Sequence, residues 1–297
     1  MLYNVKLRIS YTYEQSADSH RTLLRMLPRT LPYQSLIQGV IEADPHPSRR
    51  RDSVDFFGNP TTDLSHDMAL SQLSFQFRGR VRRSEPFTGL DLSSKFFDLP
   101  RDLAAVRDIG PNSPHHFIAA SPRVPMEKEI TTFARSVVNE NMSTLTAARA
   151  LSSALNETFD FDPTATDVST PPIVAFRNRR GVCQDITHVM IAGLRGMGIP
   201  AGYVSGFLRT VPPQGQARLE GADAMHAWVR CWCGPEIGWF EVDPTNAIDV
   251  ATDHITVAFG RDYADVAPAK GSLRSQGSHK TSHVVDVVPV DETTARM

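Results

Sequence analysis

The segment RGVCQDITHVMIAGLRGM, residues 180–197, has the clearest helical pattern in the chain. Its apolar side chains recur at helical spacing and form one stripe, at Ile186, Met190, Ile191 and Leu194. Cys183 opens this helix, so its sulfur should lie beside backbone N–H groups that have no intrahelical partner. That end of a helix acts as a fractional positive charge and stabilises a thiolate. We therefore expect a reactive cysteine, although a lone cysteine is more often a small buried apolar side chain.

Two segments farther along the chain carry the partners that such a cysteine needs. His226–Trp232 and Trp239–Asp243 have strand character, and the residues between them include the glycines and the proline of a hairpin loop. Pairing the two strands places His226 opposite Asp243, or one diagonal position away, on the same face. A carboxylate beside a histidine fixes the ring tautomer and stabilises the imidazolium. Each residue alone has an ordinary structural explanation, but together with Cys183 they predict a catalytic triad.

A metal site is the competing chemistry. Cys231 and Cys233 lie two residues apart, and with His226 they would suggest zinc. On a strand, however, both cysteines point to the face opposite His226, and a C-x-C pair lacks the usual ligand spacing. The sequence also has no Asp-rich loop of the EF-hand type that would indicate calcium. We therefore expect neither a metal nor another cofactor.

The composition is that of an ordinary soluble protein. A net charge of −2 gives no electrostatic reason to bind nucleic acid or an acidic membrane surface, and we expect neither partner. The basic run Arg49–Arg51, with prolines before it and Asp52 after it, is interpreted as a solvated loop. No apolar stretch approaches the roughly 18 residues of a membrane helix, and the N-terminus lacks the apolar core of a signal peptide. Three cysteines make no disulfide framework, which favours a cytoplasmic location.

The patterning predicts a β-rich domain at residues 1–100, a linker at 101–125 and a catalytic domain at 126–297. Alternating apolar residues from Tyr3 to Tyr11 indicate a strand, and further strands are expected at 35–42, 53–57 and 70–81. Prolines mark the linker, which has a short helix near 103–106. Helical patterns follow at 126–138 and 143–155, and Ser143 is a plausible N-cap. Strands are then expected at 201–208 and 284–290.

Several side chains near the expected triad have open roles. Gln184 and Asp185 lie in the first helical turn, where an acidic residue suits the helix dipole and either side chain could polarise a substrate carbonyl. His188 is expected to be structural, and His254, His279 and His283 have no partner that the sequence identifies. Trp228 either fills the core or lies near the site. The Gly- and Pro-rich segment Thr210–Ala224 is either a lid or a flexible crossing.

Three short segments resemble the motifs of bacterial transglutaminase-like proteins, a group to which cysteine protease activity is often ascribed. They are GVCQD at 181–185, MHAWV at 225–229 and EVDPTN at 241–246. The stretch 254–266, which ends in GRDYADV, is similar to the motif that follows the triad in this group. The N-terminal strands, with LPR at 27–29 and FGNP at 57–60, resemble the β-rich domain that often precedes the core. The resemblance covers nearly the whole chain, and the triad motifs are its most specific part.

The resemblance implies an α+β fold in which a papain-like core follows a β-sandwich-like domain. In such a core, a helix bearing the cysteine packs on an antiparallel sheet bearing the other two residues. It also implies that Cys183 is the nucleophile, His226 the base and acid, and Asp243 the orienting group. The chain departs from the usual motifs at Ile186 and Thr187 and at Met225, where serine is more usual. Because Met225 borders the site, the last difference bears on substrate preference.

The expected activity is thiol-dependent hydrolysis of an amide bond in a peptide or smaller amide, through an acyl-thioester on Cys183. Water is favoured as the second substrate because it is always available. An amine in its place gives the transfer reaction of a transglutaminase, and the same three residues serve both outcomes. A binding module without catalysis is the third alternative; its usual sign, loss of a triad residue, is absent from this sequence. The pattern specifies neither the substrate nor the oligomeric state.

Overall fold

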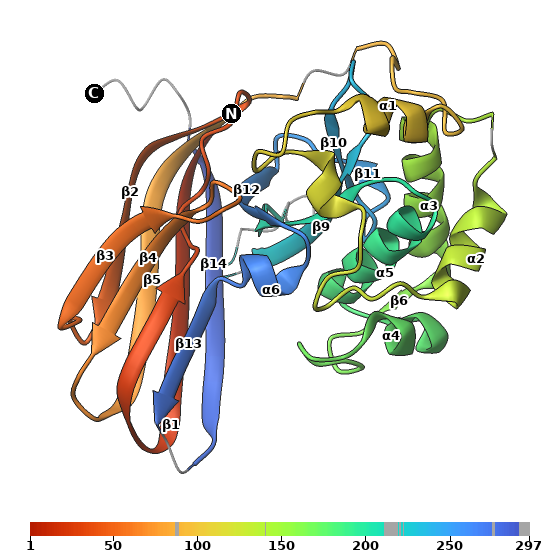
Figure 1. Ribbon diagram of the computed structural model, residues 1–297. Coiled ribbons are helices and arrows are strands. Elements are labelled where there is room, and N and C mark those ends of the chain that lie inside the picture. The colour runs from red at the N-terminus through yellow and green to blue at the C-terminus, as the bar shows by residue number, and fades with distance from the viewer. Residues whose placement is uncertain are drawn as a thin grey trace.

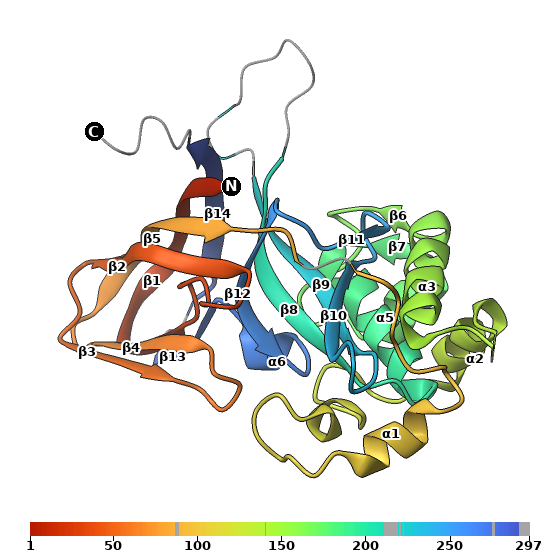
Figure 2. The ribbon, with the colours of Figure 1, turned by 90° about the horizontal axis from the view of Figure 1, so that it is seen from above.

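The computed structural model has two large β-sheets side by side, and helices cover the far face of the second sheet (Figures 1 and 2). Both sheets are antiparallel, so the predicted mixture of helices and antiparallel strands is confirmed. No helix among the described residues is long and apolar enough to span a bilayer. The structure describes residues 1–86, 89–139, 141–210, 219, 221, 223–274 and 277–290.

A seven-stranded sheet forms the N-terminal domain, and β1 (Leu2–Leu24) runs through its centre. The first half of β1 pairs with β5 and β14, whereas its second half pairs with β4 and β13. Alternate side chains from Tyr3 to Ile9 are buried, as the period-two pattern predicts. The remaining strands are β2 (Gln34–Asp44), β3 (Arg49–Val54), β4 (Pro60–His66), β5 (Leu70–Arg83), β13 (Ala269–Arg274) and β14 (His279–Val290).

Two local predictions in this domain are wrong. The basic run Arg49–Arg51 belongs to β3 rather than to a loop, although every residue of this edge strand is exposed. The strand expected at 53–57 ends at Val54 because Asp55 forms a turn. The Asp55 carboxylate accepts the backbone N–H groups of Phe57 and Asn59, which takes these residues out of the strand ladder.

The predicted division of the chain needs a correction at its C-terminal end. The sequence predicts one catalytic domain over residues 126–297, but β13 and β14 pair with β1 and belong to the N-terminal sheet. Figure 1 shows both strands, in blue, beside β1. A strand pattern identifies a strand but not its partner, so this return of the chain was not visible in the sequence. The expected linker, residues 101–125, includes most of α1 (Leu99–Ala105) and the 3₁₀ helix η1 (Pro114–Phe117).

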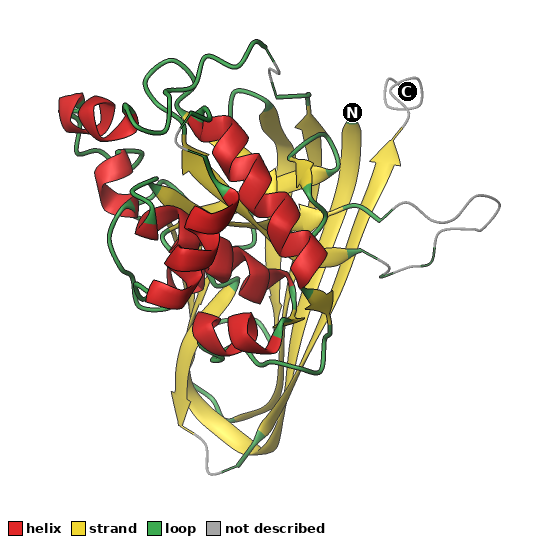
Figure 3. Ribbon diagram, turned by 90° about the vertical axis from the view of Figure 1, so that its right-hand side faces the viewer, coloured by secondary structure: helices red, strands yellow, loops and turns green. Residues whose placement is uncertain are grey.

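The second sheet has the strand order β11-β10-β9-β8-β12 and positions the candidate site. Its strands are β8 (Ala201–Leu208), β9 (Ala224–Trp232), β10 (Trp239–Asp243), β11 (Ile248–Asp249) and β12 (His254–Gly260). The helices of this half are α2 (Lys128–Val137), α3 (Thr144–Thr158), α4 (Pro172–Asn178), α5 (Cys183–Gly196) and the short α6 (Tyr263–Val266). The strands β6 (Asp160–Phe161) and β7 (Arg180–Gly181) form a small parallel pair. Figure 3 shows the helices in front of the sheet strands.

Helix α5 lies between the sheet and the other helices, and this position explains its composition. Every residue from Asp185 to Arg195 is buried, including the polar ones. Gly193 packs so closely that a β-carbon there would lie 3.1 Å from that of Ala134 on α2. The helix that begins with Cys183 is therefore fixed along its length, with its first residue at the edge of the core.

Side chains of the N-terminal domain complete the outer edge of β12. The amide of Gln34 donates to the carbonyl of Thr256 at 2.7 Å and accepts the N–H of Thr256 at 2.9 Å. Asn59 makes the same pair of bonds with Phe259, both at 2.8 Å. Two side-chain amides thus take the place of a neighbouring strand. Because β12 is buried here, these backbone groups have no access to water as an alternative partner.

The Gln34→Met variant tests this docking. Methionine keeps the length of the side chain but leaves the buried N–H of Thr256 unpaired, since only Gln34 accepts it. We expect the free energy of unfolding to fall by about 1–3 kcal/mol in urea titrations. Gln38→Met, on the exposed face of the same strand, should change it by less than about 0.5 kcal/mol. Equal losses in the two variants would contradict the docking role of Gln34.

Candidate active site

The buried carboxylate of Asp185 caps the start of α5. Asp185 accepts the backbone N–H of Val182 at 2.8 Å and the hydroxyl of Thr166 at 2.6 Å through the same oxygen. A β-carbon at Gly181 would lie 2.6 Å from that oxygen, so only glycine fits beside it. The first backbone N–H groups of any α-helix lack intrahelical acceptors, and Cys183 is the first residue of this one. The capping carboxylate thus fixes the turn that carries Cys183.

Cys183 and His226 meet at the edge of the sheet. Cys183 is half-buried, and its side chain lies close enough to the His226 ring, at the start of β9, to act on the pKa of that ring. The Nε2 atom of His226 lies 2.8 Å from Oδ2 of Asp243, the last residue of β10. Nδ1 is therefore the ring nitrogen left for the sulfur. The three residues that the sequence predicts as a triad lie together in the order sulfur, imidazole, carboxylate.

Asp243 is saturated with hydrogen bonds. Its Oδ2 accepts from His226, from the side-chain amide of Asn246 at 2.7 Å, and from Nε2 of His254 at 3.1 Å. Its Oδ1 accepts the backbone N–H groups of Thr245 at 2.9 Å and Asn246 at 3.3 Å. The side chain is fully buried. A buried carboxylate with this many donors is held both in place and in its charged form.

These contacts determine the charges of the site. Burial disfavours the imidazolium, but the hydrogen bonds to Asp243 and Cys183 outweigh it and raise the pKa of His226 to about 10. Burial would likewise raise the pKa of Asp243, but the hydrogen bonds from His226 and His254 hold it well below its usual range. At neutral pH, His226 is therefore a cation that lies between a carboxylate and the Cys183 side chain.

The strand register agrees with the diagonal arrangement of His226 and Asp243. Val242 pairs with Val229, which places Asp243 beside Trp228 and two positions from His226 on the same face. Trp228 is fully buried, its indole N–H donates to Glu241 at 2.6 Å, and its ring lies 6.1 Å from that of His226. Trp228 therefore fills the core and also borders the site, so both roles considered for it from the sequence apply.

The other side chains considered from the sequence have structural partners. Gln184 donates to the carbonyl of Val168 at 3.2 Å, and Asp185 caps the helix as described above. His188 is buried, and its Nε2 accepts the backbone N–H of Tyr263 at 3.2 Å. Most of the segment Thr210–Ala224 lies outside the described residues.

Sequence reasoning missed two partners of Asp243. Asn246 follows it in the DPTN motif, and this spacing is typical of a turn in which side chains bond to one another. His254 opens β12, and no local spacing connects it with Asp243. Its role depends on the position of β12 in the sheet, which the sequence pattern alone does not give.

Cys231 and Cys233, which the sequence does not favour as zinc ligands, lie in the core of the protein. Their sulfurs lie 3.7 Å apart, fully buried among apolar side chains. Among the described residues, a ligand-like group of three does occur at His226, Asp243 and His254. The N–H of Ala251 points to Nδ1 of His254 at 3.5 Å, so the proton of this ring is on Nε2, the atom that faces Asp243. A protonated Nε2 donates a hydrogen bond and does not bind a metal, so the chemistry of these donors does not fit a metal.

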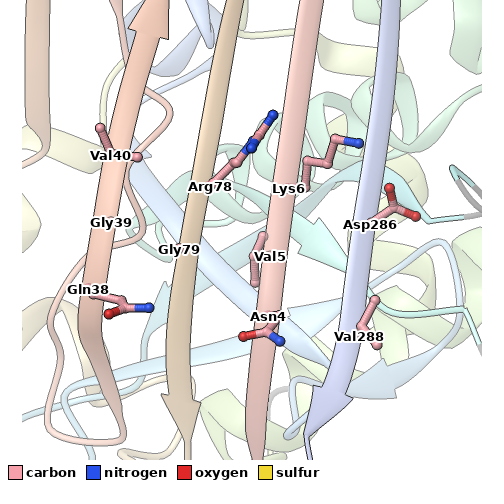
Figure 4. Close-up of a pocket in the computed structure, with 10 residues that line it drawn as sticks. All are labelled: Asn4, Val5, Lys6, Gln38, Gly39, Val40, Arg78, Gly79, Asp286 and Val288. Atoms are coloured by element: carbon pink, nitrogen blue, oxygen red, sulfur yellow. The ribbon is translucent and has the colours of Figure 1, made fainter.

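A separate groove of about 680 Å³ crosses the outer face of the N-terminal sheet. Its lining residues come from β2, β5, β1 and β14, and Figure 4 shows Lys6 of β1 beside Asp286 of β14. The groove contains none of the triad residues and no cysteine or histidine. It is therefore separate from the site around Cys183.

Two family models match the chain. The transglutaminase-like superfamily matches residues 131–244, and the bacterial transglutaminase-like N-terminal region matches residues 3–82. An uncharacterized protein of Mycobacterium tuberculosis is 30% identical over 302 residues, which is 97% of this chain and 93% of that protein. An uncharacterized protein of Mycobacterium leprae is 28% identical over 286 residues, or 93% of this chain and 95% of that protein.

One solved structure has the same fold along nearly the whole chain. It is described as "a Putative Cysteine Protease from Cytophaga hutchinsonii", and it aligns with a TM-score of 0.73 at 18% identity. The alignment covers 98% of this chain and 91% of that one. At this identity the likeness concerns the fold, including the arrangement of the N-terminal domain with the core.

The His226→Gln variant tests the charge of the site through stability. The raised pKa of His226 means that its stabilising protonation is fully present below pH 6.5 and is lost as the pH rises towards about 10. We therefore expect the stability difference between wild type and His226→Gln to shrink over this window, by at most about 1.4 kcal/mol per pH unit. Urea unfolding across the window measures it, and the titrating groups remote from His226 cancel between the two proteins. A difference independent of pH would contradict the raised pKa.

Proposed function

Because the chain belongs to the transglutaminase-like superfamily, we propose that it hydrolyses amide bonds through a Cys183 thiolate. The observation that carries this proposal is the position of His226, which contacts the Cys183 side chain on one side and the buried Asp243 carboxylate on the other. This is the arrangement that activates a thiol, since a fixed imidazolium stabilises the thiolate and can later deliver its proton.

In the first half of the reaction, the Cys183 thiolate attacks the carbonyl carbon of the amide. The developing oxyanion would bind to the free backbone N–H groups at the start of α5, where the helix dipole also favours negative charge. The carbon–nitrogen bond then breaks, and the leaving amine takes the proton from Nδ1 of His226. An acyl-thioester on Cys183 and a neutral His226 remain.

In the second half, neutral His226 accepts a proton from water, and the resulting hydroxide attacks the thioester. The carbon–sulfur bond breaks, which releases the carboxylic acid and regenerates the thiolate and imidazolium. Asp243 stays ionised throughout, and its hydrogen bond keeps the proton on Nε2 and leaves Nδ1 for transfer. An amine in place of water would give acyl transfer through the same steps.

The Cys183→Ala variant provides the decisive loss of function. Against a library of peptides and simple amides, with and without a primary amine as acceptor, we expect wild type to release free acid. Cys183→Ala should lower kcat/KM by at least about 10³-fold, and Asp243→Asn by a similar factor because it disturbs the ring tautomer. Cys231→Ala, which removes a buried thiol outside the site, should retain activity.

The same assay separates the alternatives. Product mass distinguishes the free acid from an amide formed with the added amine. If the amide is the main product, acyl transfer rather than hydrolysis is the function. Intact-protein mass spectrometry would also detect an acyl group on Cys183 with slowly processed substrates. Equal turnover by wild type and Cys183→Ala would exclude a thiol mechanism, and an absence of turnover by wild type would favour a binding role.

A further inference from the structure

Two histidines share one oxygen of the candidate orienting carboxylate. Oδ2 of Asp243 accepts from His226 at 2.8 Å and from His254 at 3.1 Å, and the two ring centroids are 6.1 Å apart. His226 also contacts Cys183, and it comes from β9. His254 comes from β12, and only 1% of its surface is exposed. The second histidine lies beyond residues 131–244, the part of the chain that matches the superfamily core.

The protonation state of His254 is fixed by its other nitrogen. Its Nδ1 accepts the N–H of Ala251 at 3.5 Å, so Nε2 carries the ring proton and donates it to Asp243. A buried ring N–H that donates to the carboxylate stabilises its charged form. The titratable groups that act on the charge of His226 are thus Cys183 from α5 and Asp243 from β10, with the His254 ring from β12 beside them.

The position of His254 is in turn fixed by its neighbours. The Trp228 ring packs edge-to-face against it at 5.2 Å. On one side along the chain, Asp253 accepts a hydrogen bond from the hydroxyl of Tyr3 at 3.0 Å, and on the other side Thr256 is held by Gln34. Tyr3 and Gln34 both belong to the N-terminal domain. That domain therefore holds the segment that carries His254.

We propose that His254 is a positioning residue. Its hydrogen bond holds Oδ2 of Asp243 in the position where this oxygen accepts the hydrogen bond from His226. The proposal rests on the proposed function, because it assigns a role in activating Cys183. The backbone N–H groups of Thr245 and Asn246 hold Oδ1, so His254 and Asn246 are the donors that fix Oδ2 independently of His226. Through the bonds of Tyr3 and Gln34, the N-terminal domain becomes part of the support of the active site.

Alkylation of Cys183 by iodoacetamide tests this role without knowledge of the substrate. The thiolate displaces iodide and forms a carbon–sulfur bond, so the rate at pH 7 reports the activated thiol. His254→Phe keeps the ring volume but removes the donor, and we expect the rate to fall about tenfold, by analogy with the loss when a hydrogen-bond partner of a metal-binding histidine is removed. His254→Gln keeps a donor and should restore the rate to within about threefold of wild type. His20→Phe removes another buried, hydrogen-bonded histidine from the N-terminal sheet and should leave the rate unchanged.

The outcomes separate this inference from the proposed function. A wild-type rate in His254→Phe, or an equal loss in His254→Gln, would overturn the positioning role while Cys183 stays activated. If the wild-type thiol reacts no faster in the native than in the unfolded protein, the proposed function fails and the positioning role falls with it. Should His254→Phe not fold, nitrogen NMR of wild type decides: we expect the His254 ring to carry its proton on Nε2, and a ring that carries its single proton on Nδ1 would overturn the proposal.

Discussion

The hydrogen bond between His226 and Asp243 is the interaction on which the site depends. The carboxylate is buried without exposure and accepts five hydrogen bonds, so it is a fixed negative charge in a region that excludes water. The His226 ring directs Nε2 towards this charge, so its other nitrogen, Nδ1, is the one available to Cys183. Both residues lie on neighbouring strands of one rigid sheet, which leaves little freedom for the ring to turn away.

The rest of the molecule supports this contact from three directions. Helix α5 brings Cys183 to the sheet, with its first turn fixed by the buried Asp185. The pairing of β9 and β10 sets the diagonal spacing of His226 and Asp243. The N-terminal domain completes the edge of β12 through Gln34 and Asn59, and β12 carries the second histidine that bonds to Asp243. The β-rich domain is thus in hydrogen-bond contact with the same sheet that carries His226 and Asp243.

Local patterns predicted much of this arrangement. The helix that begins at Cys183 and the strands β8, β9 and β10 follow from periodicity, and Ser143 caps α3 as expected, with its hydroxyl accepting the N–H of Thr146. The placement of His226 beside Asp243 followed from hairpin geometry, whereas the approach of Cys183 to them did not. What the sequence could not give were partners set by the fold: the return of β13 and β14 to the first sheet, and the bond between His254 and Asp243. Such pairings depend on which strands become neighbours, and a single strand pattern does not encode that choice.

Nitrogen-15 NMR of the His226 ring tests the central claim most directly. If the buried carboxylate holds an imidazolium beside the Cys183 sulfur, both ring nitrogens carry protons at about pH 8, where an ordinary histidine is neutral. The Nε2 proton should be the one that shifts when Asp243 is replaced by alanine. A neutral His226 ring at that pH, unaffected by the loss of Asp243, would contradict the account.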